Sequence, residues 1–285
     1  KSDGSAFMEI VYFGSDVFLS CFDYLARHHH ILALYTYHND EDYFTEFAIV
    51  RRARALGIPV HYENITPERV ARYFTQEGCE LFFVAEYNRI LPLPEGLESF
   101  RGINTHSSLL PRGRSYYPIE AAMERELPVT GVTMHKVTAR LDAGEILAQR
   151  EVPVTPELDS VDIYLRCAAC AREMLAEILA DLEGAWSRGA PQGESMPYWR
   201  RPARHLLTLD HGLTRAQAEG IFRAYNSMTQ VALDGRWHYV TGLLTGSAPL
   251  PAGTWQLAED RWLYRAADGH LRLHVHPIPP EEVAP

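Results

Sequence analysis

Asn104 and His106 are the side chains in this sequence whose types and spacing best suit acyl-transfer chemistry. They lie two residues apart, so on an extended strand both side chains point to the same side. An amide N–H can donate to a developing oxyanion, and an imidazole can move the proton of an attacking amine. Asn-x-His pairs also arise for structural reasons, so the pair alone leaves both interpretations open.

An acidic residue follows in a loop that glycine closes, Asp142-Ala143-Gly144, after an apolar run that ends at His135. A carboxylate in such a loop can reach a histidine on a neighbouring strand, fix the orientation of its ring and stabilise its positive charge. An Asp before Ala-Gly is also an ordinary turn or cap residue. On the residues alone, this second interpretation stays open.

These side chains need a scaffold, and the first part of the chain predicts one. Short apolar runs alternate with stretches of helical spacing, a pattern that favours a parallel sheet with helices on both faces. The expected strands are 8–14, 31–36, 58–61, 81–85, 102–104 and 129–135. Two helices are expected to end near residues 26 and 57, and two more are expected over 67–76 and 161–182.

The composition of the sequence changes after this α/β part. Residues 184–204 are rich in Gly, Pro, Ser and Arg, which is typical of a linker. Beyond them we expect one helix that Thr214 caps, and short strands with a hairpin turn at Asp268-Gly269. The expected parts are a leftover of cloning over 1–7, a catalytic domain over 8–183, the linker over 184–204 and a small β-rich domain over 205–285.

Four motifs together resemble the signature of the folate-dependent N-formyltransferase family. That signature is Asn-x-His with Ser-Leu-Leu-Pro, then Thr-Gly-Val-Thr and a closing Asp-x-Gly. This chain has the motifs in the same order, at 104–106, 108–111, 130–133 and 142–144. The tail from Arg201 resembles the small C-terminal domain of methionyl-tRNA formyltransferases and of sugar-modifying relatives. The resemblance implies a Rossmann-like parallel-sheet domain and then a small β-rich, OB-like domain.

The resemblance also implies N10-formyltetrahydrofolate as the formyl donor, no metal, and three catalytic residues. Asn104 would polarise the formyl carbonyl, and Asp142 would hold His106. His106 would accept the amine's proton or support the oxyanion as imidazolium, and the sequence leaves both roles open. The folate ring would rest on two segments whose candidate contacts are Tyr87, Ile90, Leu91, Val137 and Leu141.

The acceptor side departs from the family pattern after the Leu-Leu-Pro motif. Relatives often have small residues there, whereas this chain has Tyr116 and Tyr117. The tyrosines could stack on a ring of the acceptor, or they could pack under their own loop. The candidate acceptor contacts are Ser107, Ser108, Arg114, Tyr116 and Tyr117.

The charge of the chain disfavours nucleic acid as the acceptor. The formal net charge is −10, whereas surfaces that follow phosphates need clustered Lys and Arg. Residues 38–46 are acidic where tRNA-modifying members carry a basic loop, and residues 35–62 resemble the formyltransferase half of the enzyme that modifies UDP-4-amino-4-deoxyarabinose. A nucleotide-linked amino sugar is therefore the expected acceptor.

Other functions stay open behind this one. They are formylation of an amino-acid or siderophore-precursor amine, then of methionyl-tRNA, then hydrolysis of formyl-folate, and last a folate-binding protein without activity. No apolar run is long enough for a membrane helix, and the Cys167-x-x-Cys170 pair lies in a helical pattern that favours core packing over metal binding. We expect a cytoplasmic enzyme whose partner is a small-molecule amine, with a homodimer left open.

Overall fold

The computed structural model describes residues 7–38, 46–114, 116–193, 196–200, 202–245 and 254–279. The chain divides into two compact units, which are described separately. The first comprises Lys1–Pro118, Val129–Pro153 and Tyr164–Trp199, and the second comprises Ile119–Pro128, Val154–Ile163 and Arg200–Pro285.

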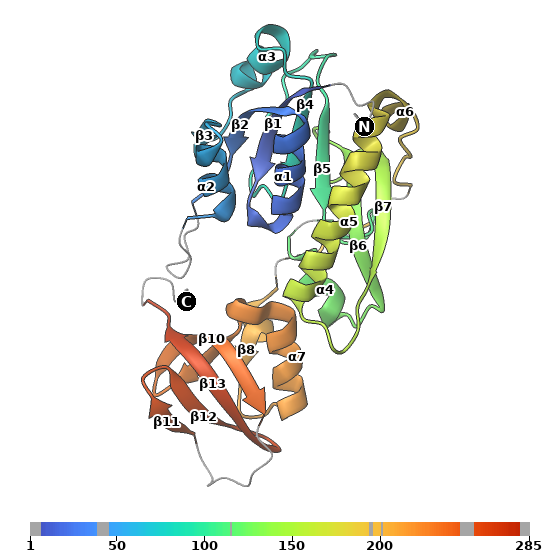
Figure 1. Ribbon diagram of the computed structural model, residues 1–285. Coiled ribbons are helices and arrows are strands. Elements are labelled where there is room, and N and C mark those ends of the chain that lie inside the picture. The colour runs from blue at the N-terminus through green and yellow to red at the C-terminus, as the bar shows by residue number, and fades with distance from the viewer. Residues whose placement is uncertain are drawn as a thin grey trace. The chain divides into compact units, whose positions relative to one another are not determined.

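A seven-stranded sheet in the order β3-β2-β1-β4-β5-β6-β7 forms the centre of the first unit (Figure 1). Strands β1 to β5 pair in parallel, which confirms the predicted parallel core. Strands β6 and β7 run antiparallel to their neighbours. The strands are β1 (Glu9–Gly14), β2 (His30–Tyr35), β3 (Val60–His61), β4 (Leu81–Ala85), β5 (Gly102–His106), β6 (Val129–Lys136) and β7 (Ile146–Pro153).

The antiparallel edge is where the sequence prediction was incomplete. The prediction omitted β7, because its side chains are mostly half-buried or exposed and give no apolar run. The short loop between β6 and β7 is too brief for a crossover helix, so the chain turns back and the two strands pair antiparallel.

Helices cover both faces of this sheet. Val11 and Phe13 of β1 pack with Val70 and Tyr73 of α3 (Pro67–Gln76) in one core cluster. Tyr12, between them in sequence, faces the other way and meets Phe22 of α1 (Leu19–His28) with ring centroids 5.3 Å apart. This alternation is what a strand buried on both faces requires.

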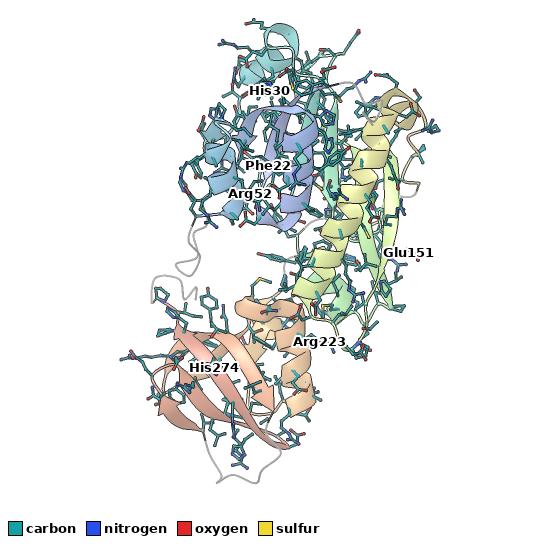
Figure 2. The ribbon with its side chains drawn as sticks, in the orientation of Figure 1. Phe22, His30, Arg52, Glu151, Arg223 and His274 are labelled. Atoms are coloured by element: carbon teal, nitrogen blue, oxygen red, sulfur yellow. The ribbon has the colours of Figure 1, made fainter. Side chains whose placement is uncertain are left out.

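The second face of the sheet carries α1, α2 (Ala48–Ala55) and α5 (Ser160–Ala180). Arg52 of α2 lies beside α1 (Figure 2), where its Nη1 is 2.6 Å from Oδ1 of Asp23. Cys167 of α5 is buried with its Sγ 3.5 Å from the carbonyl oxygen of Gly131 on β6. The cysteine predicted as a core residue therefore packs α5 against the sheet.

Most of the segment predicted as a linker, residues 184–204, is bonded to the first unit. Helix α6 (Leu182–Ser187) continues from α5, and Ala190 bridges to Ile146 of β7. Further along, the backbone N–H of Trp199 donates to the carbonyl of Arg114. Residues up to Trp199 thus belong to the first unit, held by polar contacts rather than by an apolar pattern.

The second unit contains a six-stranded sheet in the order β11-β12-β13-β10-β9-β8 and helix α7 (Arg215–Tyr225). Thr214 caps α7 as predicted, in a capping box with Gln217. The predicted hairpin is also confirmed, since Ala266 pairs with Gly269. The strands are β8 (Thr208–Leu209), β9 (Gln230–Leu233), β10 (Arg236–Thr245), β11 (Trp255–Ala258), β12 (Arg261–Ala266) and β13 (Gly269–Pro277).

Three 3-10 helices and one short α-helix complete the elements: η1 (Asp16–Phe18), η2 (Arg204–Leu207), η3 (Asn226–Met228) and α4 (Pro118–Glu124). Within the described ranges, no helix has both the length and the apolar character that crossing a membrane requires. The β-rich character of the second unit is as expected, while its OB-like topology stays a prediction.

Candidate active site

The antiparallel pairing of β5 and β6 brings a second histidine to Asn104. Asn104 and His135 are direct partners in the register of the two strands. Nδ2 of Asn104 lies 2.9 Å from Nε2 of His135 and 3.4 Å from Oδ1 of Asp142. Three residues from two strands and a loop therefore share one polar cluster.

The tautomer of His135 follows from its other contact. Its Nδ1 lies 2.9 Å from the carbonyl oxygen of Lys136, which can only accept, so Nδ1 carries the hydrogen. Burial lowers the pKa of His135 to about 4, against the opposing charge of Asp142. The ring is therefore neutral near pH 7, and its Nε2 accepts a hydrogen bond from the amide of Asn104.

The second histidine of the predicted motif makes a different contact. His106 is buried, and its Nε2 lies 2.7 Å from the carbonyl oxygen of Gly113. Because a carbonyl only accepts, Nε2 carries a hydrogen in both the neutral and the charged ring. Nδ1 is consequently the nitrogen of His106 that can take up or release a proton.

Asp142 is held at its backbone as well as at its carboxylate. Its carbonyl oxygen accepts from Nε of Arg114 at 3.1 Å and from Nε2 of Gln192 at 2.9 Å. Its φ angle is +48°, and its side chain is buried. Oδ1 lies 3.8 Å from Nε2 of His135. The resemblance implies that Asp142 holds His106, whereas these contacts are with Asn104 and His135.

The Ser-Leu-Leu-Pro motif is anchored by one threonine of the Thr-Gly-Val-Thr motif. The hydroxyl of Thr133 donates to the carbonyl of Ser108 at 2.6 Å and accepts the backbone N–H of Leu110 at 3.1 Å. Gln149 of β7 donates to the carbonyl of Leu110 at 2.7 Å. The two motifs thus form one packed unit that fixes the loop after His106.

The predicted folate-contacting segments present both buried and exposed side chains. Tyr87, Leu91 and Val137 pack on the core cluster around Phe13 and Phe82. Ile90 is 74% exposed and Leu141 is 42% exposed, although both are large and apolar. Each of the two predicted segments therefore exposes one large apolar side chain.

The predicted acceptor contacts divide into two groups. Ser108 and Arg114 are buried and bonded internally, Ser108 to the carbonyl of Arg112 and Arg114 to Asp142 and Gln192. In the structure both side chains support the framework of the loop, and their contact with an acceptor stays a prediction. Tyr116 is 56% exposed and Tyr117 is half-buried, with ring centroids 6.5 Å apart. Ser107 is buried and donates to Glu86.

Glu86 is a site residue that the motif analysis did not single out. Its Oε1 accepts from Oγ of Ser107 at 3.0 Å, at the carboxyl end of β4. Burial raises the pKa of Glu86, the charge of His106 opposes this effect and the charge of Asp142 adds to it. His135 and Glu86 both depend on strand pairing, so no local sequence signal could have found them.

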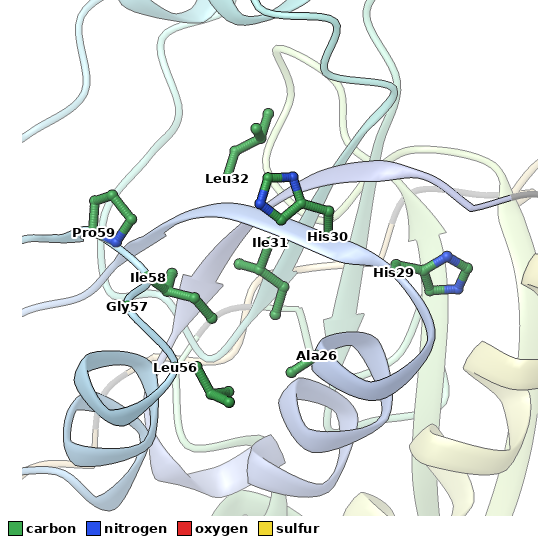
Figure 3. A pocket seen from close by; sticks show the side chains of 9 residues that line it. All are labelled: Ala26, His29, His30, Ile31, Leu32, Leu56, Gly57, Ile58 and Pro59. Carbon is green, nitrogen blue, oxygen red and sulfur yellow. The ribbon is translucent and has the colours of Figure 1, made fainter.

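A pocket of about 390 Å³ lies at the opposite, amino end of β2, between the ends of α1 and α2 (Figure 3). Its lining includes His29 and His30, whose rings point away from each other in this view. Within the described ranges, no group of His, Cys, Asp or Glu side chains is arranged to hold a metal ion. The histidine run 28–30 therefore forms no site together with the cluster around Asn104.

The parallel sheet and the packed loop motifs agree with the predicted resemblance to formyltransferases. Residues 45–179 match the formyl transferase family, which includes Asn104, His106 and Asp142. This match and the relatives described next support a folate-dependent formyltransferase family, whose members transfer a formyl group.

Curated relatives are methionyl-tRNA formyltransferases. The protein of Koribacter versatilis is 39% identical over 146 residues, which cover 50% of this chain and 47% of the relative. That of Nitrobacter hamburgensis is 27% identical over 249 residues, covering 79% and 75%. The first of these alignments thus spans about half the length of the relative.

Solved structures share the fold at low identity. HypX from Aquifex aeolicus in complex with tetrahydrofolic acid superposes with a TM-score of 0.73 at 16% identity, over 96% of this chain and 45% of that one. An N-formyltransferase from Helicobacter canadensis, in complex with folinic acid and dTDP-3-aminofucose, gives a TM-score of 0.62 at 15% identity, over 95% and 100%.

Proposed function

We propose that this protein transfers the formyl group of N10-formyltetrahydrofolate to the amine of a small acceptor, a nucleotide-linked amino sugar. The observation that carries the proposal is the cluster of Asn104, His135 and Asp142, with His106 two residues after Asn104 at the carboxyl end of β5. Open α/β sheets bind ligands at the carboxyl ends of their parallel strands, which is where His106 ends β5.

The proposed roles follow from the contacts. When bound, the folate donor supplies a formyl carbon that an amine can attack. One amide hydrogen of Asn104 is held by Nε2 of His135 at 2.9 Å, and the other, whose contact with Asp142 is long at 3.4 Å, is the one that would donate to the oxyanion. An amide N–H at that place can stabilise an oxyanion. Nδ1 of His106 accepts the proton that the amine loses, because Nε2 is held by Gly113.

The folate donor fits the chain through its apolar contacts. The exposed Ile90 and Leu141 would cover the faces of the pterin ring, and the backbone near Tyr87 and Leu91 would bond its edge. HypX and the Helicobacter canadensis enzyme were solved with tetrahydrofolic acid and folinic acid, which supports a folate at this fold.

Two acceptor classes have support. The Helicobacter canadensis structure contains dTDP-3-aminofucose, which favours a nucleotide-linked amino sugar. The curated relatives are named methionyl-tRNA formyltransferases, which makes methionyl-tRNA the second candidate. The acidic stretch 38–46 argues against tRNA by its sequence, although residues 39–45 lie outside the described part of the chain.

The test is a screen of amines with formyl-folate, with product identified by mass spectrometry. Amino sugars, sugar nucleotides, amino acids and methionyl-tRNA are compared in the same buffer. Formylated sugar nucleotide as the main product supports the proposal. Formate release that is as fast without amine as with it would identify a hydrolase instead. Tetrahydrofolate should also raise the melting temperature, and no shift at saturating folate would contradict folate binding.

A further inference from the structure

Glu86 places a carboxylate at the reacting end of the sheet. It follows β4 directly, and the parallel register pairs Ala85 with Thr105, one residue before His106. Glu86 follows Ala85 and His106 follows Thr105, so Glu86 and His106 are neighbours where the two strands end. A charge interaction between these two side chains agrees with this placement.

The backbone at Glu86 is strained. Its φ angle is +54°, in the left-handed region that side chains other than glycine rarely occupy. Such a conformation is unfavourable and persists only where the surrounding structure enforces it. Strained residues of this kind concentrate at functional sites, so the observed angle points to a role for this side chain.

The carboxylate keeps capacity for a further partner. Among the described residues, Ser107 supplies its hydrogen bond, to Oε1 at 3.0 Å, whereas an ionised carboxylate can accept about four. The titratable groups that face it come from four parts of the chain: His106 at the end of β5, Asp142 in the loop after β6, Tyr37 after β2 and Cys167 on α5. None of these is a fixed positive charge.

An amine acceptor brings a chemical requirement that this carboxylate meets. A primary amine is an ammonium cation near neutral pH, and the cation has no electron pair with which to attack a formyl carbon. One proton must leave before the attack, and a second must leave when the new bond between nitrogen and carbon forms. His106 provides one acceptor nitrogen, Nδ1, so the first proton needs another base.

We propose that Glu86 binds the acceptor as its ammonium cation and takes the first proton. The N–H bond breaks, its electron pair stays on nitrogen, and the proton bonds to a carboxylate oxygen, which leaves a neutral amine and a carboxylic acid. When the amine bonds to the formyl carbon, the second proton goes to Nδ1 of His106; the bond from that carbon to N10 of the folate then breaks, and His106 returns the proton to N10, so that tetrahydrofolate leaves. This inference rests on the proposed function and narrows it to acceptors whose amine is protonated near neutral pH.

Glu86→Gln tests the charge and keeps the hydrogen bond, since an amide oxygen can still accept from Ser107. With the acceptor that the wild-type enzyme formylates fastest in the screen, kcat/KM should fall by about tenfold or more near pH 7. The loss should shrink as the pH rises towards about 9, because the free amine then forms in solution. Glu86→Asp, which keeps the charge, should recover part of the activity near pH 7.

Two controls separate charge from position. Glu126→Gln changes another glutamate with a positive φ, +51°, outside the site, and should match the wild-type enzyme. Ser107→Ala removes the hydrogen bond to Glu86, and any loss that it causes should not depend on pH. Melting temperatures are compared for all variants. If Glu86→Gln does not fold, partial activity of Glu86→Asp with a pH dependence shifted from that of the wild type supports the inference, and an unshifted one overturns it.

The inference is wrong if Glu86→Gln stays within about twofold of the wild type from pH 6 to 9, or if its loss is independent of pH and equal to that of Ser107→Ala. These results differ from failure of the proposed function. In that case the wild-type enzyme itself would form no formylated product with any amine in the screen.

Discussion

The contacts of Asp142 with Asn104 and His135 make its partner in catalysis a question at the scale of single residues. The family resemblance implies a bond to His106, but the carboxylate lies 3.4 Å from Nδ2 of Asn104 and 3.8 Å from Nε2 of His135. A carboxylate at this place orients the amide of Asn104 by attracting the hydrogen that does not point to His135. We therefore expect Asp142 to contribute to catalysis chiefly through Asn104.

Double mutants can identify that partner. His106→Ala and Asn104→Ala should each lower the rate by about two orders of magnitude or more, the usual effect of losing a proton-transfer group or an oxyanion donor. Asn104→Ala combined with Asp142→Asn should be little worse than Asn104→Ala alone, since residues that act together are not additive. Rates are measured beside melting temperatures. The opposite result would be that His106→Ala combined with Asp142→Asn is little worse than His106→Ala, while the pair with Asn104→Ala is additive. That result would assign Asp142 to His106.

His135 should make the stability of the protein depend on pH in the acid range. Its pKa is lowered to about 4 by burial, while an unfolded histidine titrates near 6.5. Between these values the unfolded state binds the extra proton and the folded state does not, so stability falls as the pH drops from about 6.5 to about 4. Protonation would also turn Nε2 from acceptor to donor and break its bond from Asn104.

Two substitutions of His135 test this interpretation. His135→Gln offers an amide oxygen to Asn104 and cannot titrate, so its denaturant midpoint should depend less on pH between about 4 and 6.5. His135→Leu removes the acceptor and should lower kcat even where the protein is folded. Equal pH dependence of stability in wild type and His135→Gln would show that another group causes the acid loss.

At the scale of elements, close packing explains the glycines in the two loop motifs. A Cβ atom on Gly144 would lie 1.8 Å from the carbonyl oxygen of Lys136, and one on Gly131 would lie 2.2 Å from that of Arg150. No real Cβ tolerates such contacts with backbone. The Asp-x-Gly and Thr-Gly-Val-Thr motifs therefore have a steric basis in the pairing of β6 with its neighbours.

Gly144→Ala should consequently destabilise the fold by about 2–4 kcal/mol, because the loop with Asp142 must move away from β6. Gly220→Ala is the matched control: this helical glycine in α7 has no atom within 4 Å of an added Cβ. That change should be neutral or stabilise by about 0.5–1 kcal/mol. Urea unfolding measures the change in the free energy of unfolding for both variants. Equal changes in the two variants would contradict the steric explanation.

Local patterns in the sequence predicted the elements but not their partners. The two-residue spacing of Asn104 and His106 was visible, and so were strands such as Leu81–Ala85. His135 and Glu86 join the site only through the register of β5 with β6 and with β4. Register depends on packing between segments far apart in the chain, which a local pattern does not encode.

For the predicted linker, residues 184–204, composition suggested less order than the structure has. Its Gly, Pro and Ser content is typical of a flexible connection, yet Gln192 donates to the carbonyls of Asp142 and Gly144 at 2.9 and 2.8 Å. A few side-chain bonds to backbone carbonyls order this stretch, and they leave no trace in composition. The segment therefore supports the catalytic loop.

At the scale of the whole molecule, net charge bears on the choice of acceptor. The chain carries −10 at pH 7, with 27 Lys and Arg against 37 Asp and Glu. An enzyme that binds tRNA gains most of its non-specific affinity by neutralising phosphates with basic side chains. A sugar nucleotide carries few phosphates and needs only a local contact. The overall charge therefore favours the smaller acceptor.

The corresponding prediction compares dTDP-3-aminofucose with methionyl-tRNA as acceptors of the purified enzyme. Formylation of methionyl-tRNA should be slower by about two orders of magnitude or more in kcat/KM, because an acidic surface repels the phosphate backbone. A methionyl-tRNA formyltransferase from one of the curated relatives serves as the positive control for the tRNA substrate. Rates are measured at about 50 and 200 mM salt, since productive tRNA binding weakens steeply over this range and binding of a small acceptor does not. Efficient formylation of tRNA that falls with salt would contradict the prediction and make the second candidate acceptor the correct one.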